Sequence, residues 1–458
     1  MRRKIKIIAL FIISALLVYA IVFAARMFPI ISGFGAKAVC SCVFISGRSA
    51  DDVIKNELKP IPLILGSYSV DLKDSSASGS VWGFAKRKAI YRKGLGCTLI
   101  NDTSEQSVRA EHPQLAVAPA INQDSIPWPL GNLNADTVAA NIDYAQLDRA
   151  LNYAFEMQGT EIIHGTRAVV VLYNGKILKE KYAPGFNGKI PQTGWSMTKS
   201  VTSALIGILV KQGKIAVTDK NLFEAWKNDE RKNITLDNLM HANSGLKWRE
   251  VYTSPSPATN MLYRKDNMAE YAMNFLPEDK PGTHWRYSSG TANMLAYIIR
   301  QHTGNDYYRF AYDQLFYKTG MYSAIMEPDA TGTFVGSSYC FASARDWARF
   351  GLLYLNDGMV NGERILPEHW VNYTTTPSAG ATRGEYGAQF WLNAGAPGNP
   401  TIRRYPNVPT DCFYADGYEG QAVWIIPSKK LVVVRLSLQQ KNNLYENRFL
   451  ENIIRAIK

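Results

Sequence analysis

The chain has 458 residues, of which 46% are hydrophobic and 20% charged, and its formal net charge is +12 at pH 7. This composition excludes a fibrous or disordered protein, and the length allows one large domain with accessory segments. The positive charge would favour contact with an anionic lipid or polymer. It is spread along the chain with no basic cluster interleaved with aromatic residues, so we expect no nucleic-acid binding.

The first 25 residues form a segment of their own. An uncharged apolar run from Ile7 to Ala25 follows four basic residues, Arg2, Arg3, Lys4 and Lys6. The run is long enough to cross a bilayer, and its basic flank favours a cytoplasmic N-terminus. A cleaved signal peptide is the alternative, because Ala20 and Ala24 stand near possible cleavage sites. We therefore predict a single-pass inner-membrane protein with its main domain in the periplasm, or a secreted protein if the segment is removed.

Residues 26–142 predict a tether with a small β-rich element and a linker. Residues 79–84 and 88–92 resemble two strands, and the prolines between 101 and 140 indicate a linker or a wrapping strap. The chain has five cysteines, so at least one lacks a partner within the chain. In an oxidising compartment, a bridge from Cys97 to Cys40 or Cys42 would clip this segment together. No cysteine spacing suggests a zinc site, and we expect neither a metal nor a cofactor.

Residues 143–458 predict the main domain, with strands at both ends and a helical middle. A helix from Tyr144 to Met157 precedes a hairpin of residues 166–173 and 176–182, joined by Asn174 and Gly175. A second hairpin of residues 421–426 and 431–436 precedes a final helix over residues 444–457. Residues 196–375 are mostly helical. We therefore predict an α+β fold, with one antiparallel sheet built from both ends of the domain and a cleft beside the helical region.

Ser196 and Lys199 begin a predicted helix that is apolar at helical spacing as far as Val210. Residues three apart share a helix face, so the serine oxygen lies at the positive helix end beside an amine. A neutral amine could take the serine proton, which gives an activated nucleophile without histidine. The alternative is an exposed serine N-cap with a solvated lysine, because S-x-x-K arises by chance about once or twice in a chain of this size.

Three further motifs follow in order. They are L-x-x-x-x-S-G-L at residues 239–246, P-G-x-x-W-x-Y-S at residues 281–288, and a glycine-rich turn at residues 416–421 that enters a strand. Together with S-x-x-K they resemble the serine β-lactamase and penicillin-binding-protein superfamily over about residues 145–456, and its class C-like branch in particular. Residues 336–351 and 94–98 most resemble 6-aminohexanoate-dimer hydrolase-like proteins.

The resemblance implies a role for each matching residue. Ser196 would be the acylated nucleophile and Lys199 its buried proton-holding partner. Tyr287 would shuttle a proton between Ser196, the leaving group and the attacking water. The oxyanion hole would consist of the backbone N–H groups of Ser196 and Gln421.

Two departures from the family pattern bear on the substrate. Ser289 stands where the family often has asparagine, so its side chain reaches less far. Tyr418, Glu419 and Gly420 replace the usual K-T-G or H-x-G triplet, which removes the cation that can face a substrate carboxylate. This argues against β-lactams and D-Ala-D-Ala peptides and leaves neutral or amine-bearing amides and esters. Tyr252 falls where the amide-hydrolase branch places a substrate-contacting tyrosine, although a packing role fits it equally well.

The favoured interpretation is an exported, membrane-tethered serine hydrolase of small amides or esters. A β-lactamase or DD-peptidase is the second possibility, favoured by family origin and disfavoured by Tyr418. The third is a non-catalytic binding protein on the same fold. The intact set of Ser196, Lys199 and Tyr287 argues against it.

Overall fold

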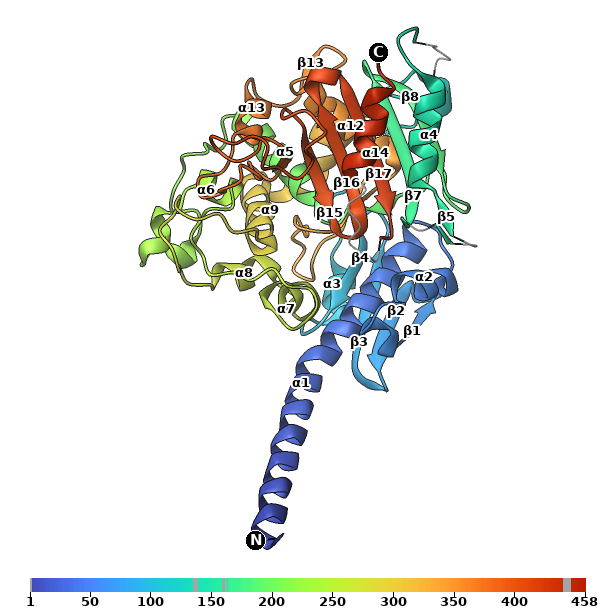
Figure 1. Ribbon diagram of the computed structural model, residues 1–458. Helices are drawn as coiled ribbons and strands as arrows, with labels where there is room; N and C mark the ends of the chain where they lie inside the picture. The colour runs from blue at the N-terminus through green and yellow to red at the C-terminus, as the bar shows by residue number, and fades with distance from the viewer. Residues whose placement is uncertain (1, 135–138, 159–160, 163, 440–445) are drawn as a thin grey trace. The chain divides into compact units, whose positions relative to one another are not determined.

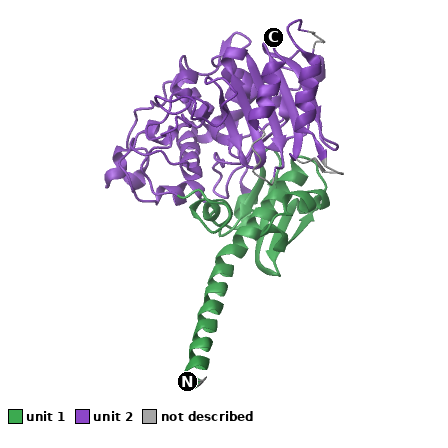
Figure 2. Ribbon diagram, viewed as in Figure 1, with its two compact units in different colours: residues 1–109, 249–266 green, residues 110–248, 267–458 purple. Residues whose placement is uncertain are grey.

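The computed structural model describes residues 2–134, 139–158, 161–162, 164–439 and 446–458. Two compact units divide the chain between them (Figure 2). Unit 1 comprises residues 1–109 and 249–266, and unit 2 comprises residues 110–248 and 267–458. Each unit therefore contains segments that are distant in sequence.

Unit 1 combines a long helix with a four-stranded antiparallel sheet in the order β1-β2-β3-β4 (Figure 1). The strands are β1 Gly66–Asp71, β2 Ser76–Val81, β3 Phe84–Arg92 and β4 Gly96–Ile100. The helices are α1 Arg2–Phe44, α2 Ala50–Glu57, η1 Leu63–Leu65, α3 Glu105–Ala110 and α7 Pro257–Arg264.

Helix α1 continues well beyond the apolar segment expected at residues 1–25. It runs without interruption to Phe44, although it contains Pro29. Its first turns are exposed, whereas most residues from Met27 onward are buried within unit 1. The tether expected at the start of residues 26–142 is thus replaced by the packed half of α1 and by helix α2. Most residues of α1 between Met27 and Cys42 are buried on all sides of the helix, so this part of the chain packs into unit 1 and does not form a tether.

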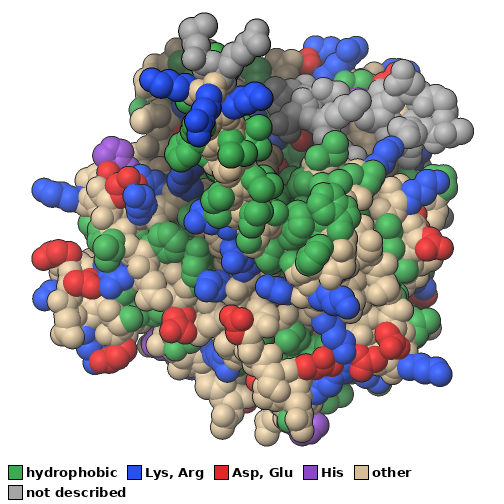
Figure 3. All heavy atoms as spheres, turned by 90° about the horizontal axis from the view of Figure 1, so that it is seen from below, with side chains coloured by type: hydrophobic (Ala, Val, Ile, Leu, Met, Phe, Trp, Pro, Cys, Tyr) green, Lys and Arg blue, Asp and Glu red, His purple; other side chains and the backbone are tan. Residues whose placement is uncertain are grey.

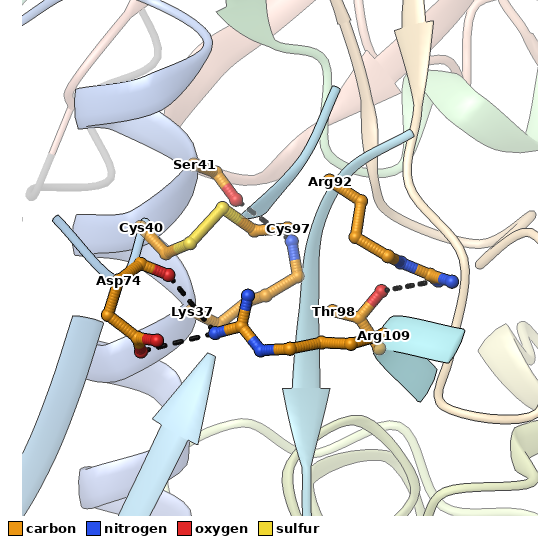
Figure 4. Close-up of a disulfide and its surroundings, with 8 residues drawn as sticks. All are labelled: Lys37, Cys40, Ser41, Asp74, Arg92, Cys97, Thr98 and Arg109. Atoms are coloured by element: carbon orange, nitrogen blue, oxygen red, sulfur yellow. Dashed lines mark hydrogen bonds and ion pairs between the residues drawn. A yellow bond between two sulfur atoms is a disulfide. The ribbon is translucent and has the colours of Figure 1, made fainter. Parts of the chain in front are cut away.

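A disulfide ties α1 to β4. Cys40 and Cys97 are bonded, which decides between the two partners considered for Cys97 (Figure 4). Beside the bridge, Lys37 donates to Ser41 at 2.9 Å within α1. The bridge closes a loop of 57 residues and so restricts the unfolded chain of this unit.

The segment 249–266 leaves the main domain sequence and folds with unit 1. The ring of Tyr263 on α7 lies 5.4 Å from that of Phe34 on α1. A side chain at Gly33 would approach the Tyr263 carbonyl to 2.9 Å, so this helix contact requires glycine. The carboxylate of Asp266 accepts backbone N–H groups of Asn101, Asp102 and Thr103. These contacts join segments about 160 residues apart, and the sequence analysis did not predict them.

Unit 2 is built around a six-stranded sheet in the order β14-β15-β16-β17-β7-β8. Its strands are β7 Thr166–Tyr173, β8 Lys176–Tyr182, β14 Trp391–Leu392, β15 Phe413–Gly417, β16 Gln421–Ile426 and β17 Leu431–Ser437. Shorter strands are β5 Met157–Gln158, β6 Glu161–Ile162, β9 Gln192–Thr193, β10 Ile325–Met326, β11 Cys340–Ala342, β12 Met359–Val360 and β13 Glu363–Arg364. The two predicted hairpins meet where β17 pairs with β7. This confirms the antiparallel sheet from both ends of the domain.

The helices of unit 2 lie on both sides of this sheet. They are α4 Tyr144–Ala154, α5 Met197–Lys211, α6 Leu236–Met240, α8 Met268–Met273, α9 Ser289–Thr303, α10 Tyr307–Ala311, α11 Tyr317–Thr319, α12 Ala344–Leu355, α13 Trp370–Thr375 and α14 Glu446–Arg455. The short helical turns are η2 Gln123–Ser125, η3 Glu224–Trp226, η4 Glu230–Asn233, η5 Gly304–Asp306, η6 Tyr312–Phe316, η7 Tyr418–Gly420 and η8 Pro427–Lys429. The final helix was predicted from residue 444, but residues 444–445 lie outside the described residues.

Two helical layers bury the sheet. Helices α4 and α14 pack on one face, where Leu151 and Phe449 join a cluster with Trp424. Helix α12 packs on the other face. A side chain at Gly351 there would approach Val432 to 2.5 Å. Because both faces are covered, β16 and β17 are buried along their whole lengths.

Candidate active site

The loop before Ser196 is held tightly against its surroundings. Strand β9 pairs with β11 through Thr193 and Phe341, and the Gly194 N–H donates to the Cys340 carbonyl at 2.8 Å. A side chain at Gly194 would lie 2.3 Å from the Trp347 ring. The chain then turns through Trp195 with φ of 45° and enters α5. Ser196 therefore stands at a rigid junction of strand and helix, at the helix N-terminus.

Lys199 lies one helical turn further on, with 2% of its surface exposed. Its Nζ donates to Ser196 Oγ at 3.1 Å, to Ser289 Oγ at 3.0 Å and to the Ser337 carbonyl at 3.0 Å. Three oxygens therefore lie within hydrogen-bond distance of the Lys199 amine. The contact with Ser196 is the one that the S-x-x-K motif predicted. Sequence reasoning missed Ser337, although it belongs to the segment 336–351 that supported the family resemblance.

Tyr287 completes the cluster from the segment that precedes α9. Its ring centroid lies 4.8 Å from Lys199 Nζ. The ring stacks on Trp391 at 5.3 Å and meets Tyr386 edge-on at 5.6 Å. Lys199 therefore has both Ser196 and Tyr287 as neighbours, and the catalytic roles of the three residues stay predictions. The aromatic support from Tyr386 and Trp391 carried no recognisable sequence signal.

Ser289, predicted as a substrate contact at the position where the family often has asparagine, lies beside Lys199. It is completely buried, and its hydroxyl oxygen accepts a hydrogen bond from Lys199 Nζ. Its short side chain therefore reaches the amine and not the open side of the site. We expect Ser289 to position Lys199.

The turn at Tyr418, Glu419 and Gly420 lies next to the nucleophile loop. A side chain at Gly417 would come within 2.2 Å of the Gly194 carbonyl, so the ends of β15 and of the nucleophile loop are in contact. Gln421 pairs with Gly417 across the turn. The oxyanion-hole pair of Ser196 and Gln421 N–H groups stays a prediction that this proximity supports.

The same turn is clamped by the end of β17. Glu419 has φ of 63°, and its carbonyl accepts from Ser437 Oγ at 2.7 Å and from the Gln439 N–H at 2.9 Å. The Gln421 side chain bonds the backbone of Ser437 in both directions. A side chain at Gly420 would lie 2.9 Å from the Arg435 guanidinium and 3.0 Å from Ser437 Oγ. Tertiary contacts thus hold a conformation that is unfavourable for a glutamate.

Tyr418 presents an aromatic ring at the edge of the site. Its exposed fraction is 51%, and its ring meets Trp195 edge-on at 5.7 Å. Partial burial, with a further contribution from Glu419, raises the pKa of Tyr418 to about 12. The phenol is therefore neutral at physiological pH, and this position brings no cation to a substrate carboxylate.

Tyr252 and two histidines in the sequence motifs have other partners. Tyr252 belongs to unit 1, where its hydroxyl donates to Glu250 at 2.5 Å, and its substrate contact stays a prediction. His241 bonds Asp237 at 2.9 Å, and His284 lies 3.3 Å from Asp279. Each of the two histidines therefore has an acidic partner.

Comparison with known proteins identifies relatives. The sequence matches the β-lactamase family over residues 163–454. It is 23% identical to the 6-aminohexanoate-dimer hydrolase of Paenarthrobacter ureafaciens over 299 residues, or 59% of this chain and 72% of that enzyme. It is 28% identical to a D-aminopeptidase of Brucella anthropi over 178 residues, which is 35% of this chain but only 33% of that enzyme.

A solved structure agrees with these relatives. The Bacillus anthracis protein provisionally assigned as a 6-aminohexanoate-dimer hydrolase superposes with a TM-score of 0.54 and 25% identity, over 63% of this chain and 78% of its own. The sheet topology, the S-x-x-K helix start and the family match, which covers most of the chain, agree with one another. The chain belongs to the β-lactamase family, within the superfamily of serine β-lactamases and penicillin-binding proteins, and is similar to 6-aminohexanoate-dimer hydrolases.

Proposed function

We propose that this protein is an exported, membrane-tethered serine hydrolase that cleaves small amides or esters through an acyl-enzyme on Ser196. The observation that carries the proposal is the hydrogen bond of 3.1 Å between buried Lys199 Nζ and Ser196 Oγ, with Tyr287 beside the amine. Relatives named as a dimer hydrolase and an aminopeptidase support a hydrolytic activity.

The reaction would proceed in two halves. Ser196 Oγ attacks the substrate carbonyl carbon while its proton passes to the Lys199 and Tyr287 pair. The backbone N–H groups of Ser196 and Gln421 stabilise the resulting oxyanion. The pair then protonates the leaving nitrogen or oxygen, which departs and leaves an ester on Ser196. Water then attacks that ester and gives a proton to the Lys199 and Tyr287 pair. The pair returns this proton to Ser196 Oγ when the carboxylic acid is released.

The edge of the site favours uncharged or amine-bearing substrates. Tyr418 stands where many family members carry a cation, and its neutral ring packs on Trp195. A substrate carboxylate placed there would lose hydration without gaining an ionic partner. This argues against β-lactams and D-Ala-D-Ala peptides as preferred substrates.

The chain organisation assigns a role to each segment. One helix near the N-terminus, Arg3–Phe44, is long and apolar enough to be a membrane span or a signal sequence. In the proposal, residues 1–25 are the anchor, residues 26–142 the small β-rich element with its linker, and residues 143–458 the hydrolase domain in the periplasm. The disulfide between Cys40 and Cys97 supports an oxidising compartment.

Ser196→Ala tests the nucleophile. We expect turnover of p-nitrophenyl esters by this variant to fall by about three orders of magnitude or more, because the variant lacks the hydroxyl that forms the acyl-enzyme. Ser203→Ala is the matched control: this buried serine of the same helix bonds the Ala388 carbonyl and is expected to leave turnover intact. Wild-type turnover by the Ser196 variant, with an unchanged circular dichroism spectrum, would rule out the assignment.

The family match also favours a second candidate, a β-lactamase or DD-peptidase. A fluorescent penicillin would acylate Ser196 in that case, whereas our proposal predicts weak or no labelling. A fluorophosphonate probe separates both from a non-catalytic binding protein, because it labels any activated serine. We expect this probe to label the wild type and not the Ser196 variant.

A further inference from the structure

Exposed apolar side chains gather at one end of the unit 1 sheet. The exposed fractions are 86% for Ile61, 57% for Ile64, 41% for Leu65, 67% for Trp82 and 68% for Phe84. These five residues, named here the apolar rim, lie at the same end because Gly66 pairs with Val81 and Val81 with Phe84. Contiguous exposed apolar surface is characteristic of an interaction site.

Helix α1 leaves the unit 1 sheet at the apolar rim. Phe28 on α1 meets the Trp82 ring edge-on at 5.4 Å, whereas Phe44 at the end of α1 stacks on Tyr91 at 5.2 Å. The helix therefore crosses the sheet from the rim to the opposite end, and its residues before Phe28 project beyond the rim (Figure 1). Whatever surrounds the projecting helix must also meet the rim.

The length of the projecting helix sets the depth at which the apolar rim would lie in a bilayer. The stretch from Ile5 to Ala24 rises about 30 Å at about 1.5 Å per residue, which matches the hydrocarbon thickness of a bilayer. Phe28 lies one helical turn further on, at the level of the lipid headgroups. Trp82 contacts Phe28 and shares that level, where tryptophan is enriched in membrane proteins.

Basic side chains accompany the apolar ones. Arg26 precedes the rim on α1, and Lys86 follows Phe84 on β3; both are exposed. On the face of the molecule seen from below, hydrophobic side chains gather in one area, with Lys and Arg side chains around them (Figure 3). This combination suits anionic headgroups over an apolar interior.

We propose that the apolar rim is a second membrane contact, which seats in the headgroup region of the bilayer that α1 crosses. The partner is an anionic phospholipid bilayer. A single helix allows the rest of the chain to rotate and tilt, whereas a helix with an adjacent rim fixes the height and orientation of unit 1. The inference rests on the membrane anchor of the proposed function and is independent of the hydrolytic chemistry.

Depth-dependent fluorescence quenching in the full-length chain tests this contact. Trp82→Cys and Lys93→Cys, each labelled with an environment-sensitive fluorophore, would be reconstituted into vesicles of phosphatidylcholine and phosphatidylglycerol that contain doxyl-labelled lipid. Lys93 is the matched control because it is exposed and follows the other end of β3, about 30 Å from the rim along the strand. Cys42, Cys340 and Cys412 are buried, and labelling of the wild type measures their background.

We expect quenching at position 82 to be several times that at position 93. Equal quenching at the two positions would overturn the inference. Phe84→Cys provides a second rim position if Trp82→Cys fails to fold.

Flotation of the wild type with the vesicles separates the outcomes. Flotation without quenching at positions 82 and 84 would refute the rim contact and leave the anchor standing. Failure to float would refute both the anchor and the rim contact, whereas Ser196-dependent ester hydrolysis in the same sample would still stand.

Discussion

Lys199 shows how a few polar atoms can define the chemistry of a buried site. Its three neighbouring oxygens come from the same helix turn, from the start of α9 and from the segment before β11. Ser289 and the Ser337 carbonyl hold the amine beside the Ser196 hydroxyl, which is the proton partner that our proposal assigns to it. Tyr287 contacts the rings of Tyr386 and Trp391, which hold it beside the Lys199 amine. The cluster is thus positioned before a substrate arrives.

A single substitution at the edge of the site tests its selectivity. We expect Tyr418→Lys to raise kcat/KM for carboxylate-bearing esters by about fivefold relative to neutral esters, because a partly exposed ion pair contributes up to about 1 kcal/mol. Tyr418→Phe keeps the ring and its contact with Trp195, and serves as the control with unchanged preference. If kcat/KM of the lysine variant for carboxylate-bearing esters does not rise, the alignment of the strand motif is wrong.

At the scale of elements, the proposed active site is a junction of segments and not the product of one motif. Helix α5 supplies Ser196 and Lys199, the start of α9 supplies Tyr287 and Ser289, and the turn before β16 supplies Gln421. The end of β17 holds that turn through Ser437, which bonds the Glu419 carbonyl. A strained turn at a functional site persists only when its surroundings hold it.

Ser437→Ala tests this clamp. Loss of the hydrogen bond should cost about 1 kcal/mol and lower kcat for a p-nitrophenyl ester about fivefold, with a smaller effect on KM, because the turn positions the proposed oxyanion hole. Ser428→Ala, at the other end of the same hairpin, removes a surface hydrogen bond to Asp411 and should leave kcat intact. A lowered melting temperature with unchanged kcat would show that Ser437 is only structural.

At the scale of the whole molecule, buried charge makes stability depend on pH. Asp329 is 3% exposed and accepts N–H groups of Met268, Thr331 and Thr333. Burial raises the pKa of Asp329 to about 6, although these donors favour the carboxylate. In the unfolded chain the pKa of an aspartate is about 3.9. Between pH ~4 and ~6 the folded state therefore binds more protons than the unfolded state. This contribution to stability is fully present below about pH 4 and is lost as pH rises to about 6.

Asp329→Asn should remove this dependence. We expect the free energy of unfolding of the wild type, relative to the variant, to fall by up to about 3 kcal/mol between pH ~4 and ~7. Denaturant unfolding at several pH values measures the difference. Asp306→Asn, at an exposed aspartate, is the control and should parallel the wild type. A constant difference between the wild type and Asp329→Asn would contradict the assignment.

Much of unit 2 could be predicted because its signals are local. Asn174 and Gly175 both have positive φ and form the tight turn that their types favour, and alternating or continuous apolar runs marked the strands of both hairpins. The spacing of Ser196 and Lys199 placed them on one helix face, and their contact follows from helix geometry. Contacts can be predicted from a sequence when the two partners are only a few residues apart.

Contacts between distant segments were missed for the opposite reason. The continuation of α1 beyond residue 25, the docking of α7 against it and the bonds of Asp266 to residues 101–103 join parts of the chain with no shared local pattern. The sequence also left two partners open for Cys97, because residues 40 and 42 differ only in the helix face that they present.

The sequence by itself determined the family, the antiparallel sheet and the pairing of Ser196 with Lys199, because periodicity, turn residues and helix spacing act over short distances. Only the tertiary structure decided that Ser289 faces Lys199, that Ser437 holds the Glu419 turn and that Trp82 lies beside α1. The physical reason is that burial and hydrogen-bond partners depend on which distant segments pack together, and each of these contacts satisfies groups that no local rule assigns.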